Sequence, residues 1–227
     1  MQTFKQHNPA TGQVISEFPE LSATELDTKI SLADSTFHSW RKRTVQERAD
    51  VFRHMGIQLK RNAETLAELI TTEMGKPLKE AKAEVEKCAS TAMFFADHVE
   101  AMLKPLTIGT EAKKSYVSFQ PTGVIFGIMP WNYPFWQVFR FAIPTLLAGN
   151  TVVVKHAPNT WGCGERIEDL FREMGCPDGI FQHLRIDVPE AEKLIADRRI
   201  TGVSLTGSTR AGRRSARDAH PDHRGRR

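Results

Sequence analysis

The sequence predicts an α/β fold built on a parallel sheet that helices cover on both faces. Its second half alternates short apolar segments with helix-like ones, and glycines mark the junctions. The strand-like segments are apolar along their length, as in residues 124–129 (VIFGIM) and 151–155 (TVVVK). Continuous apolar runs are typical of strands buried on both faces, which is the situation in parallel sheets. Such sheets bind ligands at the carboxyl ends of their strands, so a site is expected there.

The first half of the chain is expected to be mainly helical. It opens with turn residues and a short strand (NPATGQVISEFPELS), after which Ser22 or Thr24 can cap a helix that runs toward Trp40. Apolar residues at helical spacing predict two helices across 44–76 and a long amphipathic helix across 78–103. This N-terminal helical section precedes the sheet.

The pattern changes at residue 115. Residues 115–123 (SYVSFQPTG) alternate and predict an extended β arm that ends in a turn. In chain order, the elements expected next are strand 124–129, helix 134–148, strand 151–155, a helix around 163–174, strand 180–184, helix 189–196 and strand 202–207. All of these elements fit one domain that spans residues 1–212.

Composition places the protein among ordinary globular chains. Of its 227 residues, 40% are apolar and 26% are charged, which is enough apolar material for a core. No apolar stretch reaches the length of a membrane helix, and the N-terminus lacks a signal peptide's apolar segment, so we expect a cytoplasmic protein without a membrane partner. The cysteines Cys88, Cys163 and Cys176 are odd in number and unpatterned. They indicate reduced thiols rather than disulfides or a metal site.

Positive charge is concentrated at the C-terminal end. The formal net charge is +4, yet residues 210–227 contain seven arginines against two aspartates and therefore carry +5. Residues 1–209 then carry −1, so this part of the chain lacks the net positive charge that nucleic-acid binding requires. Residues 213–227 (RRSARDAHPDHRGRR) contain no Leu, Ile, Val, Phe or Met, so we expect this tail to be disordered or the product of a shifted reading frame. A tail that binds nucleic-acid phosphates is the alternative interpretation.

Three strand ends carry residues suited to ligand binding. MPWNYP follows the first strand of the sheet, KHAP the second and TGSTRAG the last. Gly207 lets the backbone approach closely and Ser208 begins a helix whose free N–H groups favour phosphate, although a plain strand–helix turn has the same sequence. Lys155 can bond ribose hydroxyls or can be a solvated lysine. The G-x-G-x-x-G pattern of ordinary dinucleotide-binding folds is not present.

Asn132 is the candidate for stabilising negative charge. Its side-chain amide can donate to a developing oxyanion, a contribution of about 3 kcal/mol in a dry site. Its alternative role is to cap the helix expected to start at Pro134. The local sequence favours neither role over the other.

Taken together, these segments resemble the aldehyde dehydrogenase superfamily, and more narrowly its NAD(P)-dependent succinate-semialdehyde dehydrogenases. The resemblance rests on residues 130–158 (PWNYPFWQVFRFAIPTLLAGNTVVVKHAP), on LTGSTRAG downstream and on NPATGQ near the N-terminus. It covers residues 7 to about 212. It implies a Rossmann-like parallel sheet that binds the cofactor, a separate catalytic domain, and a β arm that forms homo-oligomers.

The resemblance also implies an activity, the NAD(P)⁺-dependent oxidation of an aldehyde, with succinate semialdehyde as the expected substrate. Asn132 would stabilise the oxyanion, and Arg140, otherwise a helix-surface arginine, would hold the distal carboxylate. Pro158 stands where a carboxylate would repel a 2′-phosphate, so NADP is favoured over NAD. The residues expected to contact the dinucleotide are Trp131, Asn132, Lys155, His156, Ala157, Pro158, Gly207 and Ser208.

The chain departs from the family pattern in its catalytic residues. The family's nucleophilic cysteine and general-base glutamate lie in Gly-Gln-x-Cys and Glu-Leu-Gly-Gly segments, and this chain contains neither segment. Cys163 and Cys176 lie in other contexts, so we expect the catalytic domain to be missing and the chain to be inactive by itself. Two other functions stay open, a dinucleotide-binding module without chemistry and a basic-tailed protein that interacts with nucleic acid.

Overall fold

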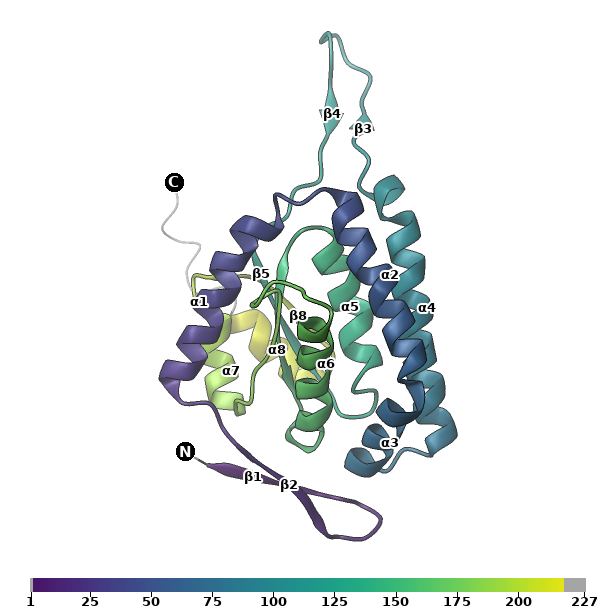
Figure 1. Cartoon of the computed structure of the whole chain (residues 1–227). Coiled ribbons are helices and arrows are strands. Elements are labelled where there is room, and N and C mark those ends of the chain that lie inside the picture. The colour runs from purple at the N-terminus through teal and green to yellow at the C-terminus, as the bar shows by residue number, and fades with distance from the viewer. Residues whose placement is uncertain (1, 219–227) are drawn as a thin grey trace.

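A four-stranded parallel sheet lies at the centre of the fold in the computed structural model, which describes residues 2–218 (Figure 1). Its strands are β5 (Val124–Met129), β6 (Thr151–His156), β7 (Phe181–His183) and β8 (Ile200–Leu205). Their order is β7-β6-β5-β8, and every neighbouring pair is parallel. The predicted α/β fold is therefore confirmed, and each expected strand lies within a few residues of its observed bounds.

Helices cover both faces of the sheet, because side chains along each strand alternate between the two faces. The covering helices are α1 (Ala23–Trp40), α5 (Trp136–Leu147), α6 (Trp161–Glu173) and α7 (Val188–Ile195). On one face Val152 and Val154 pack with α5 and α6. On the other face Phe126 and Val153 pack with α1 and α7. The face of the sheet on which a β6 side chain lies therefore alternates from one residue to the next.

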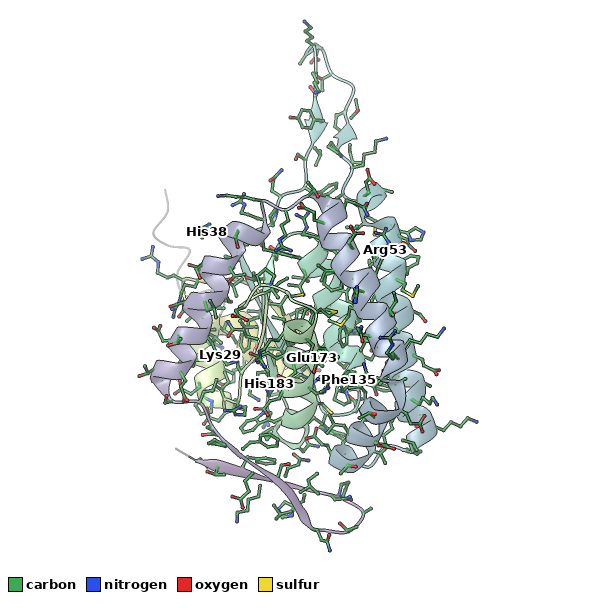
Figure 2. The ribbon with its side chains drawn as sticks, in the orientation of Figure 1. Lys29, His38, Arg53, Phe135, Glu173 and His183 are labelled. Carbon is green, nitrogen blue, oxygen red and sulfur yellow. The ribbon has the colours of Figure 1, made fainter. Side chains whose placement is uncertain are left out.

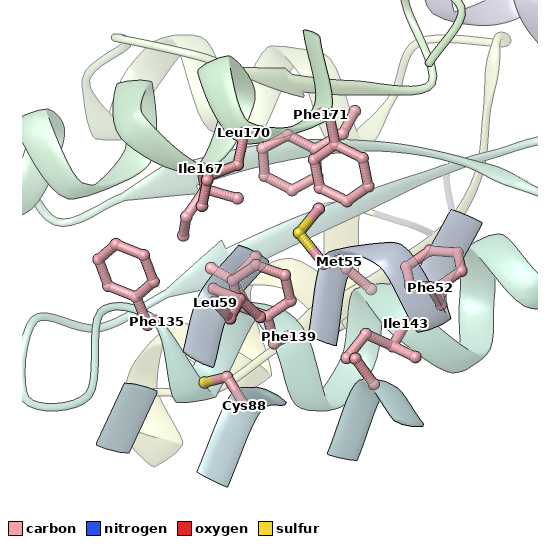
Figure 3. Close-up of a cluster of buried hydrophobic side chains, with 14 of the residues drawn as sticks. Phe52, Met55, Leu59, Cys88, Phe135, Phe139, Ile143, Ile167, Leu170 and Phe171 are labelled. Carbon is pink, nitrogen blue, oxygen red and sulfur yellow. The ribbon is translucent and has the colours of Figure 1, made fainter. Parts of the chain in front are cut away.

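The predicted helical section packs outside α5 and α6. It consists of α2 (Val45–Arg61), α3 (Ala63–Met74) and α4 (Leu78–Met102). Phe52 and Met55 of α2 join Phe139 of α5 and Phe171 of α6 in one buried cluster (Figure 3). The ring centroids of Phe52 and Phe171 are 6.2 Å apart. Within residues 2–218, no helix combines the length and apolar character needed to cross a membrane.

Ser22, rather than Thr24, caps α1. The Ser22 hydroxyl accepts a hydrogen bond from the Glu25 amide at 3.2 Å, and the Glu25 carboxylate accepts one from the Ser22 amide at 2.8 Å. This reciprocal capping box satisfies two of the backbone donors that every helix start leaves free. Within the helical section, α3 stops at Gly75, whose φ of 77° is readily adopted by glycine.

Two buried glutamates connect the helical section to the sheet layer. Glu84 of α4 accepts hydrogen bonds from the Phe135 and Trp136 amides, both at 2.9 Å, at the start of α5. Glu73 of α3 accepts from the Gly162 amide at 2.9 Å at the start of α6. A carboxylate at a helix N-terminus satisfies free donors and complements the helix dipole. Each sheet helix thus begins against a carboxylate from the helical section.

Two β ribbons extend from the body of the protein (Figure 1). The first pairs β1 (Thr3–His7) with β2 (Val14–Pro19), and the second pairs β3 (Leu106–Thr107) with β4 (Tyr116–Val117). The second ribbon contains the predicted arm and carries exposed apolar side chains. Within the segment expected to be extended, 115–123, Tyr116–Val117 pair as a strand.

The structure corrects the expectation of a disordered tail from residue 213. A helix, α8 (Thr209–Asp218), continues past that point. Its Arg214 Nε lies 2.5 Å from the Glu192 carboxylate of α7. This ion pair attaches α8 to α7, although α8 has no apolar face to pack there. The remaining part of the predicted tail, residues 219–227, lies outside the residues that the structure describes.

Candidate functional site

The three predicted β-to-α junctions meet at one edge of the sheet. β5 lies between β6 and β8, and Ile128 is in register with both Lys155 and Leu205. The Thr206 amide donates to the Ile128 carbonyl at 3.0 Å, and the Ala157 amide donates to the Met129 carbonyl at 3.1 Å. Parallel pairing therefore brings together segments that are up to 80 residues apart in the sequence.

A pocket of about 210 Å³ opens at this edge, between the sheet, α7 and α8. Two of the three junctions contribute to it, through Lys155 and Ser208. Val188 and Leu205 supply apolar walls, and Arg210 and Arg214 add two further cations. A pocket with apolar walls and a few convergent polar groups has the character of a small-molecule site.

Lys155 is nearly buried, at 7% exposed, and lacks a strong partner among residues 2–218. Its only described hydrogen bond runs from Nζ to the His156 carbonyl at 3.3 Å. Burial lowers the pKa of Lys155, and Asp187 and Glu20 partly offset this effect. A buried ammonium with one long hydrogen bond can accept additional oxygen partners, so Lys155 is suited to bind hydroxyl or phosphate oxygens of a ligand.

His156 does not point into this pocket, contrary to the expectation for its side chain. It follows Lys155 on the same strand and therefore faces the opposite side of the sheet. The imidazole is completely buried, and its Nε2 lies 3.0 Å from the Pro134 carbonyl. Its ring also lies 5.1 Å from that of His183, which ends β7 beneath α6 (Figure 2). Residue 156 can therefore meet a ligand in the pocket only through its backbone.

Asn132 does not cap a helix. The first α5 amides are instead bonded to Glu84, and Asn132 makes none of the described hydrogen bonds. Its side chain is exposed in the turn after β5, next to the half-exposed Trp131. Lys76 Nζ lies 3.6 Å from the centroid of the Tyr133 ring and so steadies this turn. Asn132 thus keeps its amide available for another acceptor.

Arg140 lies on the exposed side of α5 and reaches the third junction. Its Nη2 donates to the Thr206 hydroxyl at 3.2 Å. Trp136, one helical turn earlier, contacts the Lys87 ammonium, whose Nζ lies 3.9 Å from the ring centroid. One cation of α5, Arg140, and one of α4, Lys87, therefore lie at this face of α5, and Lys87 contacts its Trp136 ring.

The remaining predicted contact residues lie at the pocket or close to it. The Ser208 hydroxyl accepts a hydrogen bond from the Ala211 amide at 3.2 Å and caps the first turn of α8. An added Cβ at Gly207 would meet no atom closer than 3.6 Å, so this glycine is not required by packing within the described residues. Ala157 and Pro158 are half-buried in the turn after β6. No carboxylate occupies the Pro158 position.

None of the three thiols is placed for nucleophilic chemistry. All three cysteines are buried. Burial raises the pKa of Cys88 and Cys163 well above the usual value, and that of Cys176 to about 11. A nucleophilic cysteine requires the opposite, a lowered pKa and access to substrate. Within residues 2–218, no cluster of three or more metal-ligating side chains is found either.

Sequence reasoning missed both the buried glutamates and the arginine pair of the pocket. Glu73 and Glu84 resemble the surface glutamates of any amphipathic helix, and no local signal marks their burial. Arg210 and Arg214 line the pocket together. Their spacing of four residues just after a strand–helix junction, which places them on one helix face, was a usable signal.

The sequence of residues 1–225 matches the model of the aldehyde dehydrogenase family. Succinate semialdehyde dehydrogenase (NAD(P)+) Sad of Escherichia coli is 41% identical over 205 residues, which cover 90% of this chain and 44% of that protein. The probable succinate-semialdehyde dehydrogenase (NADP(+)) of Synechocystis is 44% identical over 205 residues, covering 90% of this chain and 45% of that protein.

Solved structures of the same kind share the fold. The crystal structure of succinic semialdehyde dehydrogenase from Streptococcus pyogenes in complex with NADP+ has a TM-score of 0.92 and 32% sequence identity. The match covers 95% of this chain and 48% of that one. The chain thus spans less than half the length of each of these relatives.

Proposed function

Because this chain belongs to the aldehyde dehydrogenase family, we propose that it binds NADP⁺ and forms the cofactor-binding part of an enzyme that oxidises succinate semialdehyde to succinate. One observation carries the proposal, the meeting of three β-to-α junctions beside a pocket that contains the under-bonded Lys155. The relatives named above support the choice of substrate and cofactor.

The pocket fits the adenosine end of a dinucleotide. Lys155 Nζ, with its single long hydrogen bond, would bind ribose or phosphate oxygens. Val188 and Leu205 would contact the adenine ring. The free amides at the start of α8, next to Gly207, would bind the pyrophosphate. The Ser208 hydroxyl already caps this helix, so its contribution would come mainly from the backbone.

NADP⁺ is the proposed cofactor rather than NAD⁺. A carboxylate at the end of β6 would repel a 2′-phosphate, and this chain has Pro158 there. Arg210 and Arg214 line the same pocket, and guanidinium groups favour phosphate. Arg214 is engaged with Glu192, so Arg210 is the cation that remains available among these two.

Asn132 and Arg140 would serve the substrate. When bound, NADP⁺ would accept the hydride that leaves the aldehyde carbon after a nucleophile has added to that carbon. The Asn132 amide would donate to the oxygen of that carbon as negative charge develops on it. Arg140 would bind the distal carboxylate of succinate semialdehyde through paired N–H donors, which selects acid-ended aldehydes over neutral ones.

The proposal extends to self-association through the arm. Leu106 and Tyr116 are each 54% exposed, and Phe119 is 47% exposed. Exposed apolar side chains on a projecting ribbon are expected to be covered by a partner, here other copies of the chain. Size-exclusion chromatography with light scattering checks this expectation, and a strictly monomeric chain at high concentration contradicts it.

Titration of the purified chain with NADP⁺ and NAD⁺ by calorimetry tests the cofactor proposal. We expect NADP⁺ to bind more tightly. Lys155→Met should weaken both cofactors about tenfold, since a charge-assisted hydrogen bond is lost. Pro158→Glu should weaken NADP⁺ selectively, because the new carboxylate faces the 2′-phosphate. Failure of NADP⁺ to bind, or NADP⁺ binding that Lys155→Met leaves unchanged, contradicts the proposal.

An activity assay tests whether the chain binds the cofactor without catalysing aldehyde oxidation. Because its three thiols are buried, the chain by itself should form no NADPH from NADP⁺ and succinate semialdehyde. Thiol-dependent NADPH formation by the purified chain would contradict this. Cofactor binding without turnover is the expected result and is also the behaviour of a dinucleotide-binding module.

A further inference from the structure

We infer that Lys87 of α4 is a second carboxylate-binding cation for the substrate, acting beside Arg140 across the Trp136 ring. This inference rests on the proposed function and names a specificity-determining residue for it. Lys87 Nζ lies 3.9 Å from the Trp136 ring centroid, and Arg140 follows Trp136 by one helical turn. Side chains four residues apart on a helix are neighbours, so Arg140 lies on the same face of α5 as the ring that Lys87 contacts.

Lys87 has no carboxylate partner within residues 2–218. On its own helix the residues four positions away are Ala83 and Thr91, and neither carries a charge. Glu84, three positions earlier, is already bonded to Lys76 and to the first amides of α5. Glu86 is adjacent in sequence and therefore points to another side of the helix. The exposed Lys87 ammonium is thus available to an anion.

Arg140 is in the same situation. Its neighbours on α5, at three and four positions on either side, are Trp136, Gln137, Ile143 and Pro144, none of them acidic. Its one described hydrogen bond is to the neutral Thr206 hydroxyl. Many other cations of the described chain are paired, such as Arg53, Lys29 and Arg199. Neither Lys87 nor Arg140 has an acidic partner among the described residues, so the face of α5 that carries Trp136 and Arg140 has a local excess of positive charge.

The contrast between Lys87 and Lys76 separates a ligand-binding role from a structural one. Both ammonium groups lie over aromatic rings near the start of α5, Lys76 over Tyr133 and Lys87 over Trp136. Lys76 is buried and neutralised by Glu84. Lys87 is exposed, and a cation–π contact at an exposed site is weak. A carboxylate can therefore draw Lys87 from the ring, because charge-assisted pairing is the stronger interaction.

The experiment titrates the full chain with succinate semialdehyde and follows the Trp136 indole N–H signal by NMR, assigned with Trp136→Phe. Butanal, which lacks the carboxylate, serves as the neutral probe. Lys87→Met should raise the Kd for succinate semialdehyde up to about fivefold, as expected for an exposed ion pair, and leave the weaker binding of butanal unchanged. Lys87→Arg should restore affinity to within about twofold, because it keeps the charge. Lys79→Met, an exposed lysine on the same helix, should have no effect.

The outcomes separate this inference from the proposed function. If Arg140→Met weakens binding of succinate semialdehyde while Lys87→Met does not, the inference is wrong and the proposed substrate stands. If neither variant affects binding, or the unmodified chain binds no succinate semialdehyde, the inference and the proposed substrate are both wrong, while the cofactor titration decides NADP⁺ binding separately. Thermal unfolding of each variant monitors the fold, and the exposed position of Lys87 makes a folding defect the unexpected result.

Discussion

The Lys76 ammonium and the Glu84 carboxylate form an ion pair whose side chains are 6% and 0% exposed. Glu84 uses its other oxygen to accept the Phe135 and Trp136 amides. Lys76 also lies over the Tyr133 ring, in the turn that carries Asn132. One buried pair therefore connects α4 with both the start of α5 and the proposed oxyanion donor.

Removing Lys76 should destabilise the protein strongly. Lys76→Met leaves the Glu84 charge buried without its partner, which typically costs about 3–5 kcal/mol in the free energy of unfolding. Lys82→Met is the matched control, because Lys82 pairs with Glu64 at the surface, where such pairs contribute about 0–1 kcal/mol. Urea unfolding measures both changes in the free energy of unfolding. Equal changes for the two substitutions would show that the buried pair contributes no more than the surface pair.

Gly164→Ala should destabilise the protein although alanine favours helices. A Cβ at Gly164 would lie 2.4 Å from His183 Cδ2 and 2.7 Å from His156 Nδ1, inside a packed core. Overpacking of this kind costs about 1–3 kcal/mol. Gly212→Ala is the control, because its Cβ meets nothing within 4 Å, and it should gain up to about 1 kcal/mol. Thermal unfolding of the two variants should therefore shift in opposite directions.

Acidification should destabilise the fold between about pH 6.5 and pH 4. Burial lowers the pKa of His156 from 6.5 to about 4, and burial also lowers the pKa of His183 well below its usual range. The unfolded chain therefore binds protons in this window that the folded chain does not. The stability is complete above pH 6.5 and falls by about 3 kcal/mol for His156 alone as the pH reaches its folded pKa.

Urea unfolding at a series of pH values measures this loss. Glu73 acts in the opposite sense, because burial raises its pKa, so its contribution reduces the slope at the acidic end. His156→Gln should flatten the pH dependence even where it lowers the overall stability. A free energy of unfolding that stays constant from pH 7 to pH 5 would contradict the prediction.

The native thiols should react slowly. At pH 8 a thiol with a pKa of about 11, such as that of Cys176, is almost entirely protonated, so its thiolate fraction is about a hundredfold below that of a free cysteine. Dithiobis(nitrobenzoate) should therefore modify the three cysteines only as the protein unfolds in urea. A thiol that reacts within seconds in the native protein would contradict this prediction and make that cysteine a candidate nucleophile.

Local patterns carried the prediction of most elements. Some features depend only on residues that are neighbours in the sequence, so they could be predicted from it. They are the continuous apolar runs of β5 and β6, the cap of α1 at Ser22 and the end of α3 at Gly75. The meeting of three junctions also followed, because parallel strands align their carboxyl ends whatever their order. Tail residues 213–218 were misjudged, since an ion pair to α7 rather than an apolar face holds their helix.

The sequence by itself thus determined the sheet, and it pointed to Lys155, Asn132 and, through the family resemblance, Arg140 as candidate groups at one edge of that sheet. Only the tertiary structure decided which way His156 faces and what covers the first turns of α5 and α6. The physical reason is distance along the chain: Glu84 caps amides some 50 residues away, and Glu73 some 90 away. A buried charge is identified by the partners that surround it, and those partners are assembled only when the chain folds.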